Sequence, residues 1–244
     1  MMRKIERENT GLLKPGQDLV VAGYAGLAGS VLLVKEKDQY ERLRGWFSEE
    51  WLDQAGEMEI SPEQDKIDWS EVGATDWESA GEGGILSAIW CLSGAYGTGV
   101  EFALRKIPVR QDTIEICERL ELNPYRLYSQ GCWLLSSKNG GRTVENLREK
   151  GIPAQVIGSV TKGIAREMIV ENGHGFLERP QPDELEKIFP GYFKQEAPTP
   201  LSRGSSPGMS SDWKANDQKE SMTDQEHKKD SEKKDKEGFK KEFR

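Results

Sequence analysis

A glycine-rich run, Gly81-Glu82-Gly83-Gly84, directly precedes a segment with helical periodicity. The first amides of a helix have no acceptor within the helix, and glycine lets a ligand approach the backbone closely. Glu82, Gly83 and Gly84 are therefore candidates to face a phosphate or carboxylate group bound at the helix start. The run also fits a flexible helix start without a ligand, and spacing alone favours that interpretation.

Acidic residues gather just before and within this run, at Asp76, Glu78 and Glu82. Carboxylates beside a phosphate site can hold Mg²⁺ through oxygen ligands, which makes Asp76 a further candidate to face a ligand. Residues 56–81 are acidic and polar throughout, however, so the pattern favours a solvated loop. We predict no resident metal site.

A third candidate is the segment from Ser129 to Cys132, which leads into an apolar run typical of a strand. A serine or cysteine nucleophile needs a base, and the only histidine ahead of the charged C-terminal region is His174, in a predicted turn. A structural turn is therefore the favoured interpretation, and no catalytic residue is assigned. Ser129 and Gly131 are kept as candidates to face a ligand.

Hydrophobic periodicity predicts the elements that position these residues. Strand-like runs and amphipathic helices are mixed along the chain, and the last strands follow one another through short turns. This order favours an α+β fold with a mixed sheet over a doubly wound parallel one. The predicted helices span 26–37, 38–54, 85–96, the stretch from Pro108 to Leu120, 143–150 and 182–189, and the predicted strands span 18–23, 100–104, 132–137, 154–160, 167–170 and 175–178.

Composition divides the 244 residues into three parts. Residues 1–17 form a polar N-terminal lead, and residues 18–192 are long enough for one domain with a core. Residues 193–244 are too poor in apolar side chains to offset the entropy of ordering, so we expect a disordered tail. The lysine pairs of this tail are interleaved with acidic residues, which removes any net basic character.

Charge and residue counts exclude several classes of function. A net charge of −8 makes nucleic acid and anionic membranes unfavourable partners. No run of 18 apolar residues predicts a transmembrane helix, and the N-terminus lacks the apolar core of a secretory signal. The three cysteines form no C-x-x-C pair, so we expect a reducing cytoplasm without disulfides or a cysteine zinc site. Two histidines are too few for a multi-histidine metal site.

Several segments together resemble one known family, the AIR synthase-related proteins of the hydrogenase-maturation-factor kind. The similarity runs from about residue 11 to residue 189 and keeps the order of the family's motifs. It implies the family's C-terminal domain, a three-layer α+β unit. The matching segments are 14–20 (KPGQDLV), 24–30 (YAGLAGS), 82–90 (EGGILSAIW), 99–101, 106–117, 122–127 followed by Ser129 and Gly131, and 151–161.

The resemblance also implies differences from full-length members, which are two-domain ATP-binding enzymes. Their N-terminal domain supplies a glycine-rich segment, metal-binding aspartates and most of the dimer contact, and this chain starts at the second domain. In an ungapped comparison Glu78 and Ser79 replace the family's His-Asp pair, and Gly81 replaces a threonine. Asp76 can stand for the aspartate if the loop is longer. The terminal cysteine of the cyanide-forming member has no counterpart in residues 241–244.

Three functions follow as hypotheses from this resemblance. The first is a stand-alone, non-catalytic C-terminal domain that associates with a protein partner or with itself, with no cofactor bound to the chain alone. The alternative is a subunit that completes an ATP-dependent site with a separately encoded N-terminal half, so that ATP and Mg²⁺ bind in the complex. The third is a remnant without a selected function.

Overall fold

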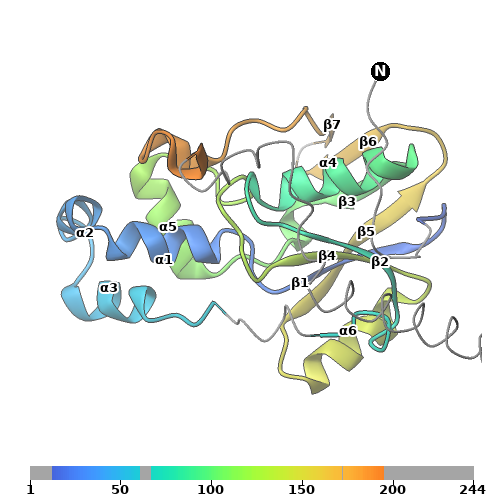
Figure 1. The fold of residues 1–244 in the computed structure, drawn as a ribbon, viewed down its shortest axis with the longest axis horizontal. Coiled ribbons are helices and arrows are strands. Elements are labelled where there is room, and N and C mark those ends of the chain that lie inside the picture. The colour runs from blue at the N-terminus through green and yellow to red at the C-terminus, as the bar shows by residue number, and fades with distance from the viewer. Residues whose placement is uncertain (1–12, 61–66, 172, 195–244) are drawn as a thin grey trace, which may run out of the picture. The chain divides into compact units, whose positions relative to one another are not determined.

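The computed structural model describes residues 13–60, 67–171 and 173–194, and in these a seven-stranded sheet lies between helices (Figure 1). The strand order is β2-β4-β1-β5-β3-β6-β7, and only β3 and β6 pair in parallel. This mixed sheet confirms the predicted α+β class. The strands are β1 (Asp18–Ala22), β2 (Ala74–Ser79), β3 (Gly99–Ala103), β4 (Trp133–Ser137), β5 (Ala154–Thr161), β6 (Arg166–Val170) and β7 (Gly173–Phe176).

The helices form two layers on the sheet and a separate group at one end of it. The α-helices are α1 (Leu27–Lys35), α2 (Lys37–Leu43), α3 (Glu49–Gly56), α4 (Gly84–Tyr96), α5 (Gln111–Leu120) and α6 (Gly140–Glu149). Short 3₁₀ turns are η2 (Leu104–Lys106), η3 (Glu184–Lys187) and η4 (Tyr192–Lys194). None of the helices in the described ranges is long and apolar enough to cross a membrane.

Helices α4 and α6 cover opposite faces of the sheet (Figure 1). Helix α4 packs on β2 and β4, and its Ile89 belongs to the same buried cluster as Phe102 of β3. Helix α6 packs on β1, β4 and β5, with Leu147 in a second cluster that includes Leu135. The helix–sheet–helix arrangement confirms the three layers that the resemblance implied.

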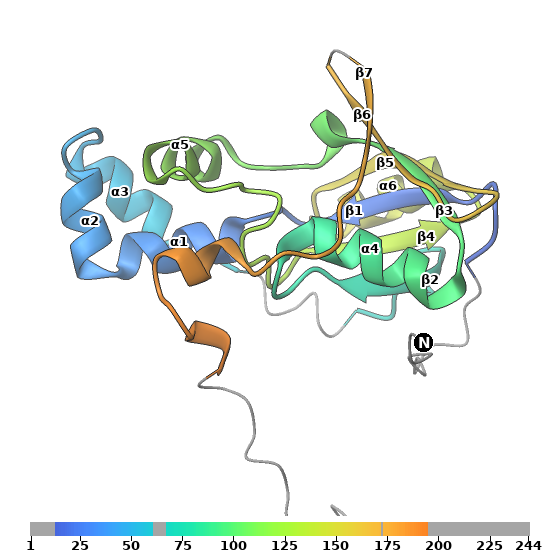
Figure 2. The ribbon, with the colours of Figure 1, turned by 90° about the horizontal axis from the view of Figure 1, so that it is seen from above.

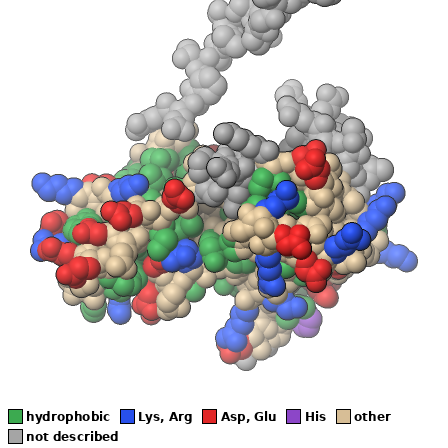
Figure 3. Space-filling view, turned by 90° about the horizontal axis from the view of Figure 1, so that it is seen from below, with side chains coloured by type: hydrophobic (Ala, Val, Ile, Leu, Met, Phe, Trp, Pro, Cys, Tyr) green, Lys and Arg blue, Asp and Glu red, His purple; other side chains and the backbone are tan. Residues whose placement is uncertain are grey.

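A third apolar cluster holds α1, α2, α3 and α5 together, beside one end of the sheet (Figure 2). Leu33, Leu52 and Ile116 are buried there, together with Leu127 from the segment that leads to β4. A Cβ at Gly29 would lie 2.4 Å from Leu127 Cγ, so a glycine is needed where α1 meets this segment. Outside the cores, one face of the molecule mixes acidic, basic and hydrophobic side chains (Figure 3).

The prediction of one continuous helix over 38–54 is wrong. The structure has two helices there, α2 and α3, separated by a turn at residues 44–48. The Ser48 hydroxyl accepts a hydrogen bond from the Trp51 amide at 3.3 Å and so starts α3 as its N-cap. The apolar periodicity continues across this turn, which is why it predicted one helix.

The predicted loop over 56–81 is wrong at β2. This strand pairs with β4 as an edge strand of the sheet, and Asp76 within it is completely buried. The sequence of β2 does not show the alternation of apolar and polar residues that is typical of a strand, because Asp76 and Glu78 occupy positions where that pattern predicts apolar residues.

Two later predictions need smaller corrections. His174 lies within β7, opposite Ile169 of β6, and not in a turn. The predicted helix 182–189 is only the 3₁₀ turn η3, whose first residue follows Asp183. The predicted tail lies outside the described residues apart from Phe193 and Lys194, as does most of the N-terminal lead.

Candidate functional site

The glycine run opens α4 as predicted, and a carboxylate of the same chain lies at the helix start. Gly83 and Gly84 have φ angles of 76° and 66°. The Gly83 amide donates to Asp183 Oδ2 at 2.7 Å. Asp183 Oδ1 accepts from the amides of Tyr128, at 3.2 Å, and Leu185, at 2.9 Å. An external phosphate at Gly83 would have to displace Asp183, and the phosphate-facing role of the run stays a prediction.

The ionisation of Asp183 reflects this position. Burial raises the pKa of the Asp183 carboxyl above its ordinary value, whereas the three amides that donate to it lower the pKa. The nearby Glu82 carboxylate raises the pKa further. Glu82 itself is exposed beside the helix start.

Ser129 connects the starts of two helices. Its hydroxyl donates to Leu127 O at 2.6 Å and accepts from the amide of Gly26, the N-cap of α1, at 2.8 Å. Its own amide donates to Gly81 O at 3.0 Å, just ahead of α4. Ser129 is buried, and both hydrogen bonds of its hydroxyl are to backbone atoms. Its geometry is therefore that of a structural turn and not of an activated nucleophile.

The buried cysteines are poorly suited to nucleophilic chemistry. Cys117 and Cys132 are both buried, and burial raises the pKa of each thiol to about 12. A thiol with that pKa stays protonated near neutral pH, and the thiolate is the reactive form.

Asp76 is separated from the acidic group in which the sequence placed it. Asp76 Oδ1 accepts from the Trp77 amide at 2.8 Å, and Oδ2 has no hydrogen-bond partner among the described residues. It is buried in the sheet, whereas Glu82 is exposed at the start of α4. In the described ranges no three His, Cys, Asp or Glu side chains are placed to hold a metal ion.

Gly131 lines a pocket of about 440 Å³ where the end of β1 meets the start of β5. Three lining residues are glycines with left-handed φ: Gly23 at 87°, Gly131 at 79° and Gly151 at 76°. Arg110 and Lys150 bring two positive charges to the wall, and Glu59 brings one negative charge. Open backbone beside a guanidinium and an ammonium group suits a carboxylate or phosphate ligand.

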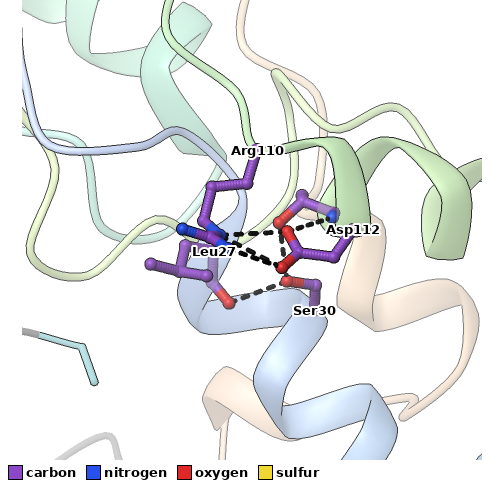
Figure 4. A network of polar contacts seen from close by, with 5 residues as sticks. Leu27, Ser30, Arg110 and Asp112 are labelled. Atoms are coloured by element: carbon purple, nitrogen blue, oxygen red, sulfur yellow. Dashed lines mark hydrogen bonds and ion pairs between the residues drawn. The ribbon is translucent and has the colours of Figure 1, made fainter. Parts of the chain in front are cut away.

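A polar network fixes Arg110 at this pocket (Figure 4). Arg110 Nε lies 3.1 Å from both carboxylate oxygens of Asp112, and Nη2 lies 3.0 Å from Oδ2. Asp112 Oδ1 also accepts from the Thr113 amide at 2.9 Å. The Thr113 hydroxyl lies 2.9 Å from that of Ser30, which donates to Leu27 O on α1 at 2.9 Å. The hydrogen bonds from Arg110 to Asp112 also raise the pKa of the guanidinium.

The ionisable side chains in the described lining of the pocket are those of Tyr24, Glu59, Arg110 and Lys150. None of its described lining residues is Ser, Thr, Cys or His. Arg110 and Lys150 were missed as site residues by sequence reasoning. The available signals were the Arg110–Asp112 spacing at a predicted helix start and the glycine that follows Lys150.

Comparisons with known proteins agree on the fold. A family profile described as AIR synthase related protein, C-terminal domain, matches residues 14–170. E. coli HypE, a hydrogenase maturation protein, has a similar structure with a TM-score of 0.55 and 20% identity, over 73% of this chain and 54% of that chain.

Two further HypE structures, one in a HypE–HypF complex and one in complex with ATP, each give a TM-score of 0.50 and 16% identity. They cover 68% and 69% of this chain and 54% and 52% of those chains. This chain thus spans about half the length of these structures. No curated protein matched the sequence.

Proposed function

Because this chain belongs to the family of AIR synthase-related proteins, through their C-terminal domain, we propose that it acts by associating with another protein and does not catalyse a reaction alone. It is then an association domain in a hydrogenase-maturation-factor-like group. The crystal structure of a HypE–HypF complex supports a role of this kind for a protein of similar fold.

The observation that carries the proposal is the uncovered outer part of the sheet. Strands β6 and β7 project from the body as a hairpin (Figure 2). Phe176 on β7 is 71% exposed, and Ile164 in the turn before β6 is 75% exposed. Large apolar side chains on a projecting sheet edge are typical of a surface that pairs with another protein.

Three side chains of types that often act in catalysis have structural roles in this chain, which supports the non-catalytic part of the proposal. Ser129 holds two helix starts, and Asp183 accepts three amides. Cys132 is a buried thiol with a pKa raised to about 12. These three side chains contribute to the fold, and none of them lines the pocket at Arg110.

The association is tested by measuring mass in solution and co-purification. Light scattering of the purified chain is expected to give a mass above the 27.5 kDa of one chain, or the tagged chain is expected to recover one protein in stoichiometric amount from its source cells. An unrelated acidic domain serves as the control bait. A 27.5 kDa monomer that recovers no stoichiometric partner would contradict the proposal.

A second candidate function is favoured by the pocket at Arg110 and Lys150. In that account the chain completes an ATP-dependent site with a separately encoded N-terminal half, and the cationic wall faces an anionic group of the ligand. The structure of HypE in complex with ATP makes this class of ligand a reasonable choice for a protein of similar fold. Mg²⁺ would then enter with the nucleotide.

A further inference from the structure

We propose that one partly uncovered face of the sheet, here called the open face, is the docking surface for a basic amphipathic helix of a partner protein. This inference rests on the proposed association function and adds to it the surface and the chemistry of the partner. The open face consists of Glu101, Ala103, Glu167, Ile169, His174 and Phe176.

Strand register places these six residues on one side of the sheet. Glu101 of β3 lies opposite Glu167 of β6, which lies opposite Phe176 of β7. Residues directly opposite in neighbouring strands point to the same face. Ala103, Ile169 and His174 form a parallel row two residues further along.

The open face is on the same side of the sheet as α6. Glu101 also lies opposite Ser159, which lies opposite Asp18 of β1. Asp18 Oδ2 accepts from the amide of Gly140, the first residue of α6, at 2.7 Å. The row of Asp18, Ser159, Glu101, Glu167 and Phe176 therefore begins under α6 and continues beyond it.

Helix α6 covers only the inner strands on this side, since it packs on β1, β4 and β5. Among the described residues no helix packs extensively on β7, and Phe176 and Ile169 stay 71% and 36% exposed. A sheet normally buries its apolar face under another element. A second helix beside α6 would complete this layer, and that defines the shape of the partner segment.

The negative charge of the open face indicates that the partner segment is basic. Glu101 and Glu167 are like charges directly opposite one another, which destabilises the bare sheet. Within the described ranges neither carboxylate has an ion-pair partner, and the nearby Arg105 pairs with Glu171 instead. Lys or Arg side chains on a docking helix would neutralise both glutamates, while its apolar side chains cover Ile169 and Phe176.

The same charges argue against a second copy of this chain as the occupant. A two-fold contact between two open faces would bring Glu101 and Glu167 toward the same residues of the other copy, and such like-charge contacts oppose association. A segment of opposite charge fits, and a segment of the same charge does not.

The test uses two synthetic helices as probes, one of leucine and lysine and one of leucine and glutamate, each about 18 residues long so that it holds helical structure. Fluorescence anisotropy measures their binding to the full chain. The lysine probe is expected to bind the native chain, and the charge-reversed Glu101→Lys/Glu167→Lys variant is expected to lose about tenfold in affinity for it and to gain the glutamate probe.

A matched control shows whether probe binding depends on the open face or only on the overall negative charge of the chain. Glu145→Lys/Glu149→Lys makes the same charge change on the exposed side of α6 and is expected to alter lysine-probe affinity by less than about twofold. Circular dichroism and urea midpoints confirm that both variants fold. Equal losses in the two variants, or no binding of the lysine probe to the native chain, would overturn the assignment.

The outcome is separable from that of the proposed function. If the native chain recovers a stoichiometric partner and Glu101→Lys/Glu167→Lys recovers it equally well, the open face is not the docking surface, although the association stands. If the native chain neither exceeds one-chain mass nor recovers a partner, the proposed function itself fails.

Discussion

Replacing Gly84 with alanine is expected to lower the free energy of unfolding by about 3–5 kcal/mol. Gly84 has a φ of 66°, and an added Cβ would lie 2.6 Å from Tyr125 O and 2.8 Å from Leu127 O. Both are backbone atoms, so no side-chain rotation relieves the overlap. Urea unfolding followed by circular dichroism measures the loss as a lower midpoint at unchanged slope.

Gly97→Ala is the matched control for this experiment. Gly97 ends α4 with a φ of 63°, but an added Cβ there has no atom within 4 Å. Gly97→Ala is expected to lower the free energy of unfolding by about 1 kcal/mol, because only the left-handed backbone conformation disfavours a side chain there. Similar losses at the two positions would show that the contact of the α4 start with residues 125–127 is looser than described.

Replacing Asp183 with alanine is expected to cost about 3–4 kcal/mol, because it leaves the amides of Gly83, Tyr128 and Leu185 without their acceptor in a buried site. The pH dependence gives a second measure. Burial raises the pKa of this carboxyl, so the folded state binds the proton first as pH falls. The contribution of Asp183 to stability is therefore lowest near neutral pH and increases as pH falls through the raised pKa toward 3.8.

Asp183→Asn tests that sign, because the amide keeps an acceptor oxygen but does not titrate. The difference in unfolding free energy between the native chain and Asp183→Asn is expected to shift in favour of the native chain as pH is lowered from 7 toward 4. A shift in the opposite direction would mean that the pKa of Asp183 is lowered in the fold, with the amides outweighing burial.

Sequence patterns predicted those helices and strands whose apolar spacing lies within the element itself. The apolar spacing of Ile85, Ile89 and Leu92 predicted α4 within one residue of its start, because one face of that helix is buried throughout. The structure ends α4 at Gly97, which takes the left-handed conformation that glycine adopts easily. The resemblance to a family supplied the three-layer arrangement, which periodicity alone did not give.

The parts that sequence reasoning missed depend on contacts between distant residues. Asp183 lies one hundred residues from Gly83, and nothing local to either predicts that one accepts from the other. The pocket likewise joins Gly23, Arg110 and Lys150 from separate loops. The burial of Asp76 was missed because a carboxylate inside a sheet contradicts the usual preference of acidic residues for solvent.

The measurement that tests the central claim most directly is isothermal titration of the purified chain with Mg-ATP. The claim is that the chain acts by association and does not bind and turn over a nucleotide alone. It predicts no saturable heat, because a domain that acts only by association needs no nucleotide site of its own. Saturable heat near one site per chain would contradict the claim, because the chain would then bind a nucleotide without a partner, and phosphate release measured on the same sample would show whether it also turns the nucleotide over.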